Sequence, residues 1–300
     1  MSNLSHIPVL NREVDVSLIL MPYASLERPS IALSILKSSL NNIGVSSSVV
    51  YGNIMLAEKI GAHIYDVINK SQSNILIGEW TFSGTLFPEH DPSSESYFEQ
   101  IGYGLDTLQP YIKHLGSEMN IREVVTIIRN IAGEYINDLA HQVLATKPKI
   151  VGCSSTFQQH CASLAILKRI KELDASIVTM IGGANCEASM GIVTHKECDW
   201  LDYVVSGEAD ILFPELTRSI LDGLHLGLKE LPYGVIGPRH REENLYQMLA
   251  LKPPRAKLKS MGDSPVPDYD DYFEFVEHST CGQFIKPGLL LESSRGCWWG

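Results

Sequence analysis

The sequence has few basic residues. It contains 24 Lys and Arg against 35 Asp and Glu, which gives a formal net charge of −11 at pH 7 and a pI near 5.4. Excess negative charge opposes binding to phosphate backbones and to anionic lipid headgroups. We therefore expect neither nucleic acid nor a membrane surface to be a partner.

Long apolar runs are missing too. None approaches the roughly 20 residues that a helix needs to cross a bilayer, and the N-terminus lacks a basic segment followed by an apolar one. Cysteines are scattered, with no Cys-x-x-Cys pair, which fits a reducing compartment better than a disulfide framework. We therefore expect a cytoplasmic protein. The six cysteines are Cys153, Cys161, Cys186, Cys198, Cys281 and Cys297.

The most regular stretch of the chain, residues 149–208, reads as strand, helix, strand, helix, strand. The three strands are expected at Ile150–Cys153, Ser176–Ile181 and Tyr203–Val205. Strands that alternate with helices predict right-handed crossovers and a parallel sheet. The first helix has a core-facing stripe of apolar residues: Ile166, Leu167, Ile170 and Leu173.

Small or polar residues follow each of these three strands. The strands end in Ser154, in Gly182-Gly183 and in Ser206-Gly207-Glu208. In an open α/β sheet this carboxyl edge is where ligands bind, and a flat group could lie against the bare backbone of the two glycines. The alternative is that the glycine pair only turns the chain. The stretch lacks both Gly-x-Gly-x-x-Gly and Gly-x-x-x-x-Gly-Lys-Ser/Thr, which weakens a dinucleotide or nucleoside-triphosphate interpretation.

The flanking segments extend the same sheet. Further strands are expected at Val16–Met21, at Ser47–Tyr51 and, on an edge, at Tyr233–Ile236. Periodicity predicts helices over 31–40, 53–69, Ile121–Ala145 and from 214 to about 221, whereas 75–80 suggests another strand or an extended element. The aromatic-rich, irregular segment 82–119 is interpreted either as a cap over the ligand edge or as a small inserted helical pair.

Three regions follow from this pattern. We expect one α/β domain over 1–251, with a helical insertion at 82–146, and then a linker over 252–286 that is rich in proline and charge. A fresh apolar strand is expected at Gly288–Leu291, within a third region over 287–300. The acidic run that contains Asp268, Asp270 and Asp271 is interpreted as solvated rather than as a metal site.

The central stretch resembles a known family. The run VGCSSTFQQHCASLAILKRIKE, together with IVTMIGGANCE and DYVVSGEADILFPEL, is similar to the cobalamin-binding domains that precede radical S-adenosylmethionine barrels. The resemblance implies a doubly wound, Rossmann-like sheet whose strand-end loops hold the corrin and its benzimidazole tail. The cofactor contacts that it implies here are Tyr23, Ser25, Ser30, Ser154, Ser155, Gly182, Gly183, Gly207 and Glu208.

The last nine residues narrow the resemblance. ESSRGCWWG, which follows PVPDYDDYF in the expected linker, resembles the first barrel strand of radical S-adenosylmethionine enzymes of the RiPP maturation radical SAM protein 1 type. In such enzymes cysteine thiolates hold a [4Fe–4S] cluster to which S-adenosylmethionine binds. The resemblance makes Cys297 the first cluster cysteine, and the remaining ones are expected after Gly300. The chain of 300 residues alone is therefore expected to be inactive.

The activity that the resemblance implies is radical methylation of an unactivated carbon in a ribosomally made precursor peptide, with cobalamin as methyl donor. Cyclisation or rearrangement of the peptide stays open. The rival functions are a non-catalytic cobalamin sensor or carrier module, and a flavodoxin-like domain for another flat ligand.

One family signature is absent. Cobalamin-binding mutases and methionine synthases carry Asp-x-His-x-x-Gly after the first strand, and its His binds cobalt. This pattern occurs nowhere in the chain, and the corresponding loop, PYASLERPS, has no His. The nearest candidate, His160, opens a helix and is expected to be solvated. We therefore expect cobalamin bound with its benzimidazole detached and with no protein nitrogen on the cobalt.

Overall fold

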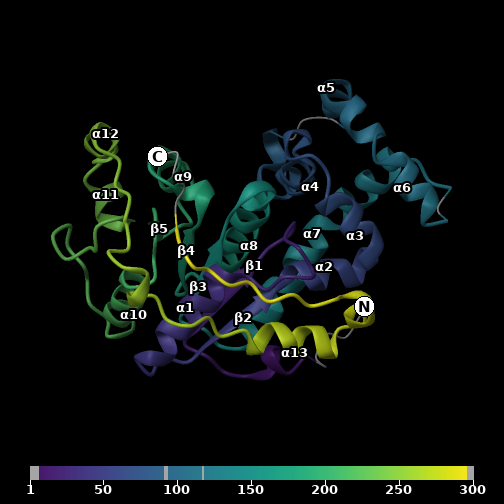
Figure 1. Ribbon diagram of the computed structural model, residues 1–300. Coiled ribbons are helices and arrows are strands. Elements are labelled where there is room, and N and C mark those ends of the chain that lie inside the picture. Colours follow the sequence, from purple (N-terminus) through teal and green to yellow (C-terminus); the bar gives the residue numbers. More distant parts are fainter. Residues whose placement is uncertain (1–6, 91–93, 117, 296–300) are drawn as a thin grey trace.

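The computed structural model describes residues 7–90, 94–116 and 118–295, and it contains a six-stranded sheet in the order β2-β1-β3-β4-β5-β6 (Figure 1). Strands β1 to β5 run parallel, and β6 pairs antiparallel with β5. The predicted α/β architecture with a doubly wound parallel sheet is confirmed. The strands are β1 (Val16–Leu20), β2 (Ser47–Tyr51), β3 (Ile150–Ser154), β4 (Val178–Gly182), β5 (Tyr203–Val205) and β6 (Val235–Ile236).

Helices cover both faces of this sheet, which is why the strands are apolar on both sides. The helices α7 and α8, with α4 packed on both, cover one face, whereas α1 and α10 cover the other (Figure 1). The longer helices are α1 (Ile31–Asn42), α2 (Gly52–Ile60), α3 (Ala62–Asn69), α4 (Ile77–Leu86), α5 (Ser94–Asp106), α7 (Ile121–Ala145), α8 (His160–Leu173), α9 (Ser189–Glu197), α10 (Leu212–Leu221) and α13 (Asp270–His278). The shorter ones are α6 (Gln109–His114), α11 (Pro238–Glu242) and α12 (Tyr246–Leu251).

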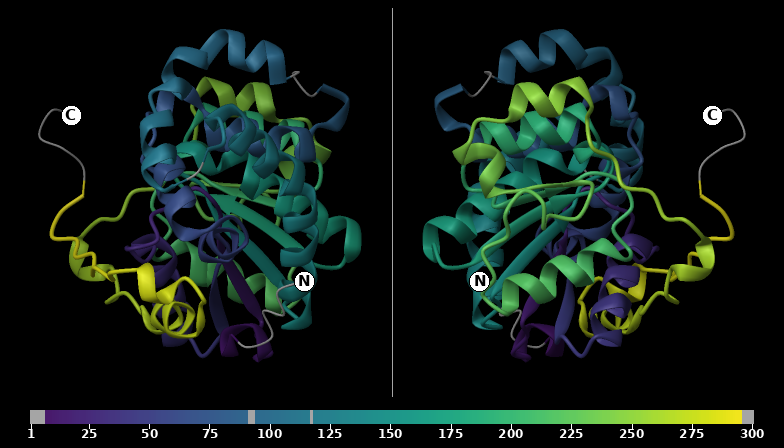
Figure 2. Two further views of the ribbon diagram at one scale, coloured as in Figure 1. Left: turned by 90° about the vertical axis from the view of Figure 1, so that its right-hand side faces the viewer. Right: turned by 90° about the vertical axis from the view of Figure 1, so that its left-hand side faces the viewer.

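Two expected elements differ in the structure. The segment 75–80, expected as a strand or extended element, belongs mostly to α4, because its apolar residues are buried between α7 and α8 rather than in the sheet. The helix expected over 53–69 is broken into α2 and α3 at Gly61, whose φ of +91° an L-residue rarely adopts. The segment 82–119 contains the helices α5 and α6, which lie in the upper half of both views in Figure 2, away from α13.

The stretch expected as a linker contains α13, which covers the outer edge of β2. The Asp271 carboxylate accepts a hydrogen bond from the backbone N–H of Val49 at 2.7 Å, and it pairs with Lys37 Nζ at 2.9 Å. Tyr272 and Phe275 are fully buried. Asp271 is thus part of the core, so the expectation of a solvated run is wrong for this residue. An edge strand leaves N–H groups unpaired, and a buried carboxylate satisfies one of them here.

The segment Gly288–Leu291 is not a strand in the structure. Leu289 and Leu291 are 60% and 92% exposed, and the described part of the chain supplies no neighbouring strand to pair with them. The segment is instead attached to the domain by two hydrogen bonds: Gly288 N to the Glu27 carbonyl at 2.7 Å, and the Tyr269 hydroxyl to the Leu290 carbonyl at 2.7 Å. Among the described residues, no helix is long and apolar enough to cross a membrane.

Candidate functional site

A cavity of about 230 Å³ lies between α1 and the carboxyl ends of β3, β4 and β5. Its floor follows from the strand register, which places Leu18, Gly152 and Met180 side by side. Residues two positions further along a strand point to the same face, so Ser154 and Gly182 continue this floor. Because two of these positions are glycine, the sheet surface there lacks side chains, and α1 leaves a space above it.

The walls of the cavity are mostly apolar. They come from one face of α1, from Val205 at the end of β5 and from Phe213 on α10. A flat apolar group would find little to hydrogen-bond with inside the cavity and a large surface to pack against, which is typical of ligand sites. The α1 residues that line it are Ile31, Ala32, Leu33, Ile35 and Leu36.

Charged residues surround the mouth of the cavity. Asp210, which follows β5, and Arg295 form a two-pronged ion pair with nitrogen–oxygen distances of 2.7 and 2.8 Å. Burial opposes ionisation of Asp210, but hydrogen bonds from Arg295 and from the Ser264 hydroxyl outweigh it and lower the pKa of this carboxyl. Glu292 also lines the mouth and pairs with the same guanidinium. Arg295 therefore brings the last described residues of the chain onto the cavity.

Five of the expected cofactor contacts line the cavity: Ser154, Gly182, Gly183, Gly207 and Glu208. At two of these positions the backbone conformation itself also requires glycine. Gly183 has a φ of +94°, and a Cβ there would lie 2.5 Å from the Ser155 carbonyl oxygen. Gly207 has a φ of +96° and a similarly close contact with Ala256. Gly182 has neither constraint, so its missing side chain matters mainly for the cavity.

The other four expected contacts lie outside the cavity lining. Tyr23 is buried, with its ring 5.2 Å from that of Tyr65, and thus belongs to the core. The Ser25 hydroxyl accepts a hydrogen bond from the backbone N–H of Glu27 at 3.2 Å. Ser30 caps α1 by accepting from the Leu33 N–H at 3.3 Å. These three side chains shape the loop after β1, and the structure does not bring them to the cavity.

Ser155, the fourth, belongs to a partly buried hydrogen-bond network with His160. Its hydroxyl lies 3.1 Å from His160 Nδ1, and the other ring nitrogen lies 3.3 Å from the Thr194 hydroxyl. Burial lowers the pKa of His160. The expectation that His160 is solvated is therefore wrong, because its partly buried ring lies between the Ser155 and Thr194 hydroxyls. Both ring nitrogens are already engaged within the protein.

Sequence reasoning missed Gly152, the α1 face and Arg295. Gly152 interrupts an apolar strand, and such a glycine is a signal of close approach by another group. The apolar residues of α1 were expected to pack on the sheet, and nothing local distinguishes packing from lining a cavity. Arg295 lies in the family-like ending, but its partner Asp210 is far away in the sequence. Cys297 lies outside the described residues.

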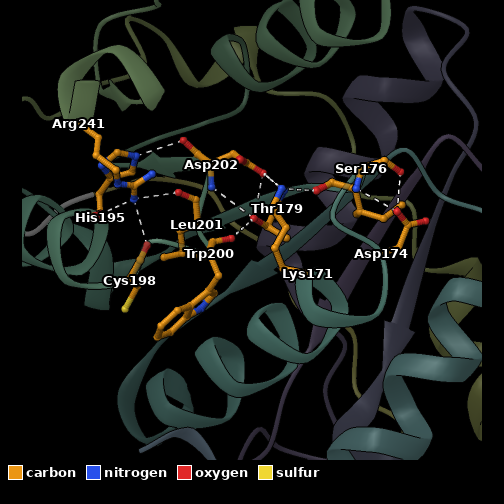
Figure 3. Close-up of polar contacts among 11 residues, drawn as sticks. Lys171, Asp174, Ser176, Thr179, His195, Cys198, Trp200, Leu201, Asp202 and Arg241 are labelled. Carbon is orange, nitrogen blue, oxygen red and sulfur yellow. Dashed lines mark hydrogen bonds and ion pairs between the residues drawn. The ribbon is translucent and has the colours of Figure 1, made fainter. Parts of the chain in front are cut away.

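A second polar network lies at the opposite end of the sheet (Figure 3). Asp202 accepts hydrogen bonds from Lys171 Nζ and from the Thr179 N–H at 2.7 and 2.8 Å. One nitrogen of Arg241 donates to three backbone carbonyls at the end of α9 and before β5. These contacts fix α9 and α11 to the sheet, and they are structural. Among the described residues, no group of three or more His, Cys, Asp or Glu could hold a metal ion.

Comparison with known proteins gives distant matches. No family model matches the chain. It is 25% identical over 187 residues to a Pyrococcus horikoshii protein named as an uncharacterized methyltransferase, a match that covers 62% of this chain and 38% of the relative. Two solved structures of the radical S-adenosylmethionine methyltransferase TsrM from Kitasatospora setae are 14% identical, with a TM-score of 0.37.

The solved structures extend well beyond the aligned part. One holds tryptophan substrate and an S-adenosylmethionine analog, and the match covers 74% of this chain and 28% of that one. The other holds cobalamin and a [4Fe-4S] cluster, with 85% and 31% covered. This chain therefore spans well under half of the length of the proteins it resembles.

Proposed function

We propose that this chain is the cobalamin-binding part of a radical S-adenosylmethionine enzyme that methylates a carbon of a ribosomally made peptide. The observation that carries the proposal is the apolar cavity, whose floor lacks side chains at Gly152 and Gly182. It lies at the carboxyl ends of parallel strands, where α/β sheets bind ligands. The motif resemblance of the central stretch and of the ending supports the same cofactor, and the similarity to a protein named as a methyltransferase supports the reaction class.

The residues present fit the group. A flat bicyclic base can pack between the glycine floor and α1, while the corrin would lie outside at the strand ends, beside Gly183 and Gly207. The chain would bind and orient the cofactor, and its apolar walls would exclude water. When bound, cobalamin would supply a transferable methyl group. The side chains with polar or ionisable groups that line the cavity are Cys153, Ser154, Glu208, Asp210, Glu292 and Arg295, and the proposal gives none of them the role of acid, base or nucleophile.

Binding tests the cofactor assignment directly. Purified chain mixed with hydroxocobalamin and separated by gel filtration should carry the corrin absorption spectrum at a ratio approaching one per chain. Flavin mononucleotide in a parallel mixture tests the flavodoxin-like rival. Retention of flavin without corrin would overturn the proposal.

A second observation distinguishes the enzyme from a non-catalytic cobalamin sensor or carrier module. If the gene continues past Gly300, two more cysteines close after Cys297 support the enzyme, because a cluster needs further thiolates. Their absence would favour a sensor or carrier. Methylation itself is tested with the full-length product and the small peptides encoded beside it, by the mass increase of one methyl group per site.

A further inference from the structure

The Asp210–Arg295 ion pair is the strongest polar contact at the cavity that the proposed function leaves unexplained. Its side chains are 6% and 18% exposed, so it is far more buried than an ordinary surface pair. The guanidinium contacts both carboxylate oxygens, at 2.7 and 2.8 Å. A two-pronged pair of this kind fixes orientation as well as distance.

Both partners are further restrained by their surroundings. The Asp210 carboxylate accepts a hydrogen bond from the Ser264 hydroxyl at 2.5 Å, and its backbone carbonyl accepts one from Ser39 on α1 at 3.0 Å. A carboxylate oxygen of Glu292 accepts a hydrogen bond from Arg295 Nε at 2.9 Å. The pair therefore joins α1, the loop after β5 and the end of the described chain at one point of the cavity mouth.

The surrounding chain is otherwise loosely attached. Leu289 and Leu291 are largely exposed, and the segment has no strand partner in the part of the chain that the structure describes. Apart from the Glu292 contact within the segment, Arg295 makes the last attachment to the domain, two residues before Cys297.

We propose that Asp210 is a positioning residue that binds Arg295 and thereby holds the end of the described chain, Glu292 to Arg295, at the mouth of the cavity. This inference rests on the proposed function, in which Cys297, two positions later in the sequence, takes part in the same reaction as the bound cobalamin. A defined approach of two reacting groups requires that one of them is not free to move away. Asp210 would contact neither reactant, and its role is exerted through Arg295.

Trypsin tests the pair without any cofactor. Trypsin must take the arginine side chain into its own pocket, so an Arg295 held by Asp210 is protected. Cleavage after Arg295, followed by the loss of Gly296–Gly300 in the mass spectrum, should be at least about tenfold faster in Asp210→Asn. The matched control is Glu242→Gln, which removes the exposed partner of Arg239 and should leave cleavage after Arg295 unchanged. Equal rates in wild type and Asp210→Asn would overturn the proposal.

A second variant tests the same ion pair if Asp210→Asn does not fold. Arg295→Lys keeps the charge and the trypsin site but lacks the planar fork. It lies near the end of the described chain, and it should also be cleaved faster, with an unchanged thermal midpoint. If cleavage after Lys at this position stayed as slow as in wild type, the two-pronged geometry would not be what holds the segment.

The positioning role has its own signature. With Cys297 replaced by Ser, a spin label at Ser294→Cys should give a narrow distribution of distances to bound cob(II)alamin, and Asp210→Asn should broaden it at least twofold. A distribution that is equally narrow in both proteins would overturn the positioning role. Failure to bind cobalamin would instead sink the proposed function, and the trypsin result would still decide whether the pair holds the segment.

Discussion

The carboxylate of Asp271 reaches across to β2 and accepts a hydrogen bond from the Val49 N–H at 2.7 Å, 222 positions earlier in the chain. The same carboxylate lies 2.9 Å from the buried Lys37 ammonium. One side chain thus satisfies a donor of the edge strand and balances a buried charge. It also attaches α13 to the domain, so the segment expected as a linker contributes to the stability of the sheet.

Replacement of Asp271 by Ala should lower the free energy of unfolding by about 3 kcal/mol, because it leaves the buried Val49 N–H without its acceptor and leaves the buried Lys37 ammonium with Asp268 alone. Urea denaturation followed by circular dichroism measures this change. The neighbouring Asp270 is exposed, so Asp270→Ala is the matched control and should cost less than about 1 kcal/mol. Similar losses in the two variants would contradict the role assigned to Asp271.

The stability of the fold should fall at mildly acidic pH because of His195. This residue is fully buried, with Nδ1 2.9 Å from the Tyr246 hydroxyl and Nε2 3.1 Å from the Asp202 carbonyl. Burial, and then the nearby Arg241 charge, lower its pKa from 6.5 to about 4. Between these two values the unfolded chain binds a proton that the folded chain does not, so the free energy of unfolding decreases as the pH falls through this interval.

The expected loss from His195 between pH 7 and pH 5 is about 2 kcal/mol. Urea titrations at the two pH values measure it. His195→Gln should be less stable at pH 7 but should depend less on pH, and the exposed His225 provides the control variant His225→Gln. A pH dependence that is the same in wild type and His195→Gln would refute the assignment. His160 and His240, whose pKa values burial also lowers, act in the same direction and leave a residual slope.

The two adjacent glycines at the end of β4, Gly182 and the following Gly183, should respond differently to substitution. Gly182→Leu directs a side chain into the cavity, with its Cβ no closer than 3.3 Å to its neighbours, so affinity for hydroxocobalamin should fall at least about tenfold. The overpacking cost to stability should stay within about 1–3 kcal/mol. Gly183→Ala should instead destabilise the fold, because its positive φ and the 2.5 Å approach to Ser155 exclude a Cβ.

Spectrophotometric titration and thermal melting separate these effects. Gly133→Ala on α7, whose Cβ would meet nothing closer than 3.7 Å, is the control and should change neither quantity beyond a small stabilisation. If Gly182→Leu binds hydroxocobalamin as tightly as wild type does, the cavity is not the ligand site.

The elements that the sequence predicts best are those whose bounds depend on residues close together in the chain. The bounds of α7 match Ile121–Ala145 because an amphipathic stripe and an Asn120 capping box mark its length and start. Strands β1 and β2 were visible as short apolar runs. The edge strand β6 was expected to be longer, and only Val235–Ile236 pair with β5.

The candidate site was only partly predictable, since it depends on contacts between distant segments. The carboxyl edge and its small residues follow from strand order, and Ser154, Gly182 and Gly207 were found in this way. The role of α1 as a cavity wall depends on side chains missing from the sheet opposite it. The link between Asp210 and Arg295 joins positions 85 apart. No periodicity or local propensity encodes either relationship.

The last prediction concerns the ligand beneath the cobalt. The loop after β1 contains no His, and the nearest candidate, His160, is held by Ser155 and Thr194 through its two ring nitrogens. An imidazole nitrogen is the usual protein donor to a transition metal, but here ligation would require breaking a partly buried hydrogen bond. A benzimidazole packed in the cavity would also be removed from the cobalt. We therefore expect neither nitrogen to bind it.

Electron paramagnetic resonance of cob(II)alamin bound to the chain measures this directly. The cobalt lines should show no splitting by an axial nitrogen, and His160→Ala should give the same spectrum as wild type. Splitting that disappears in His160→Ala would identify the histidine as the ligand. Splitting that persists would mean that the benzimidazole stays on the cobalt, and the cavity beside Gly182 would then need another occupant. Absence of splitting in both proteins is the result that the geometry predicts, because no free nitrogen donor reaches the strand ends among the residues described there.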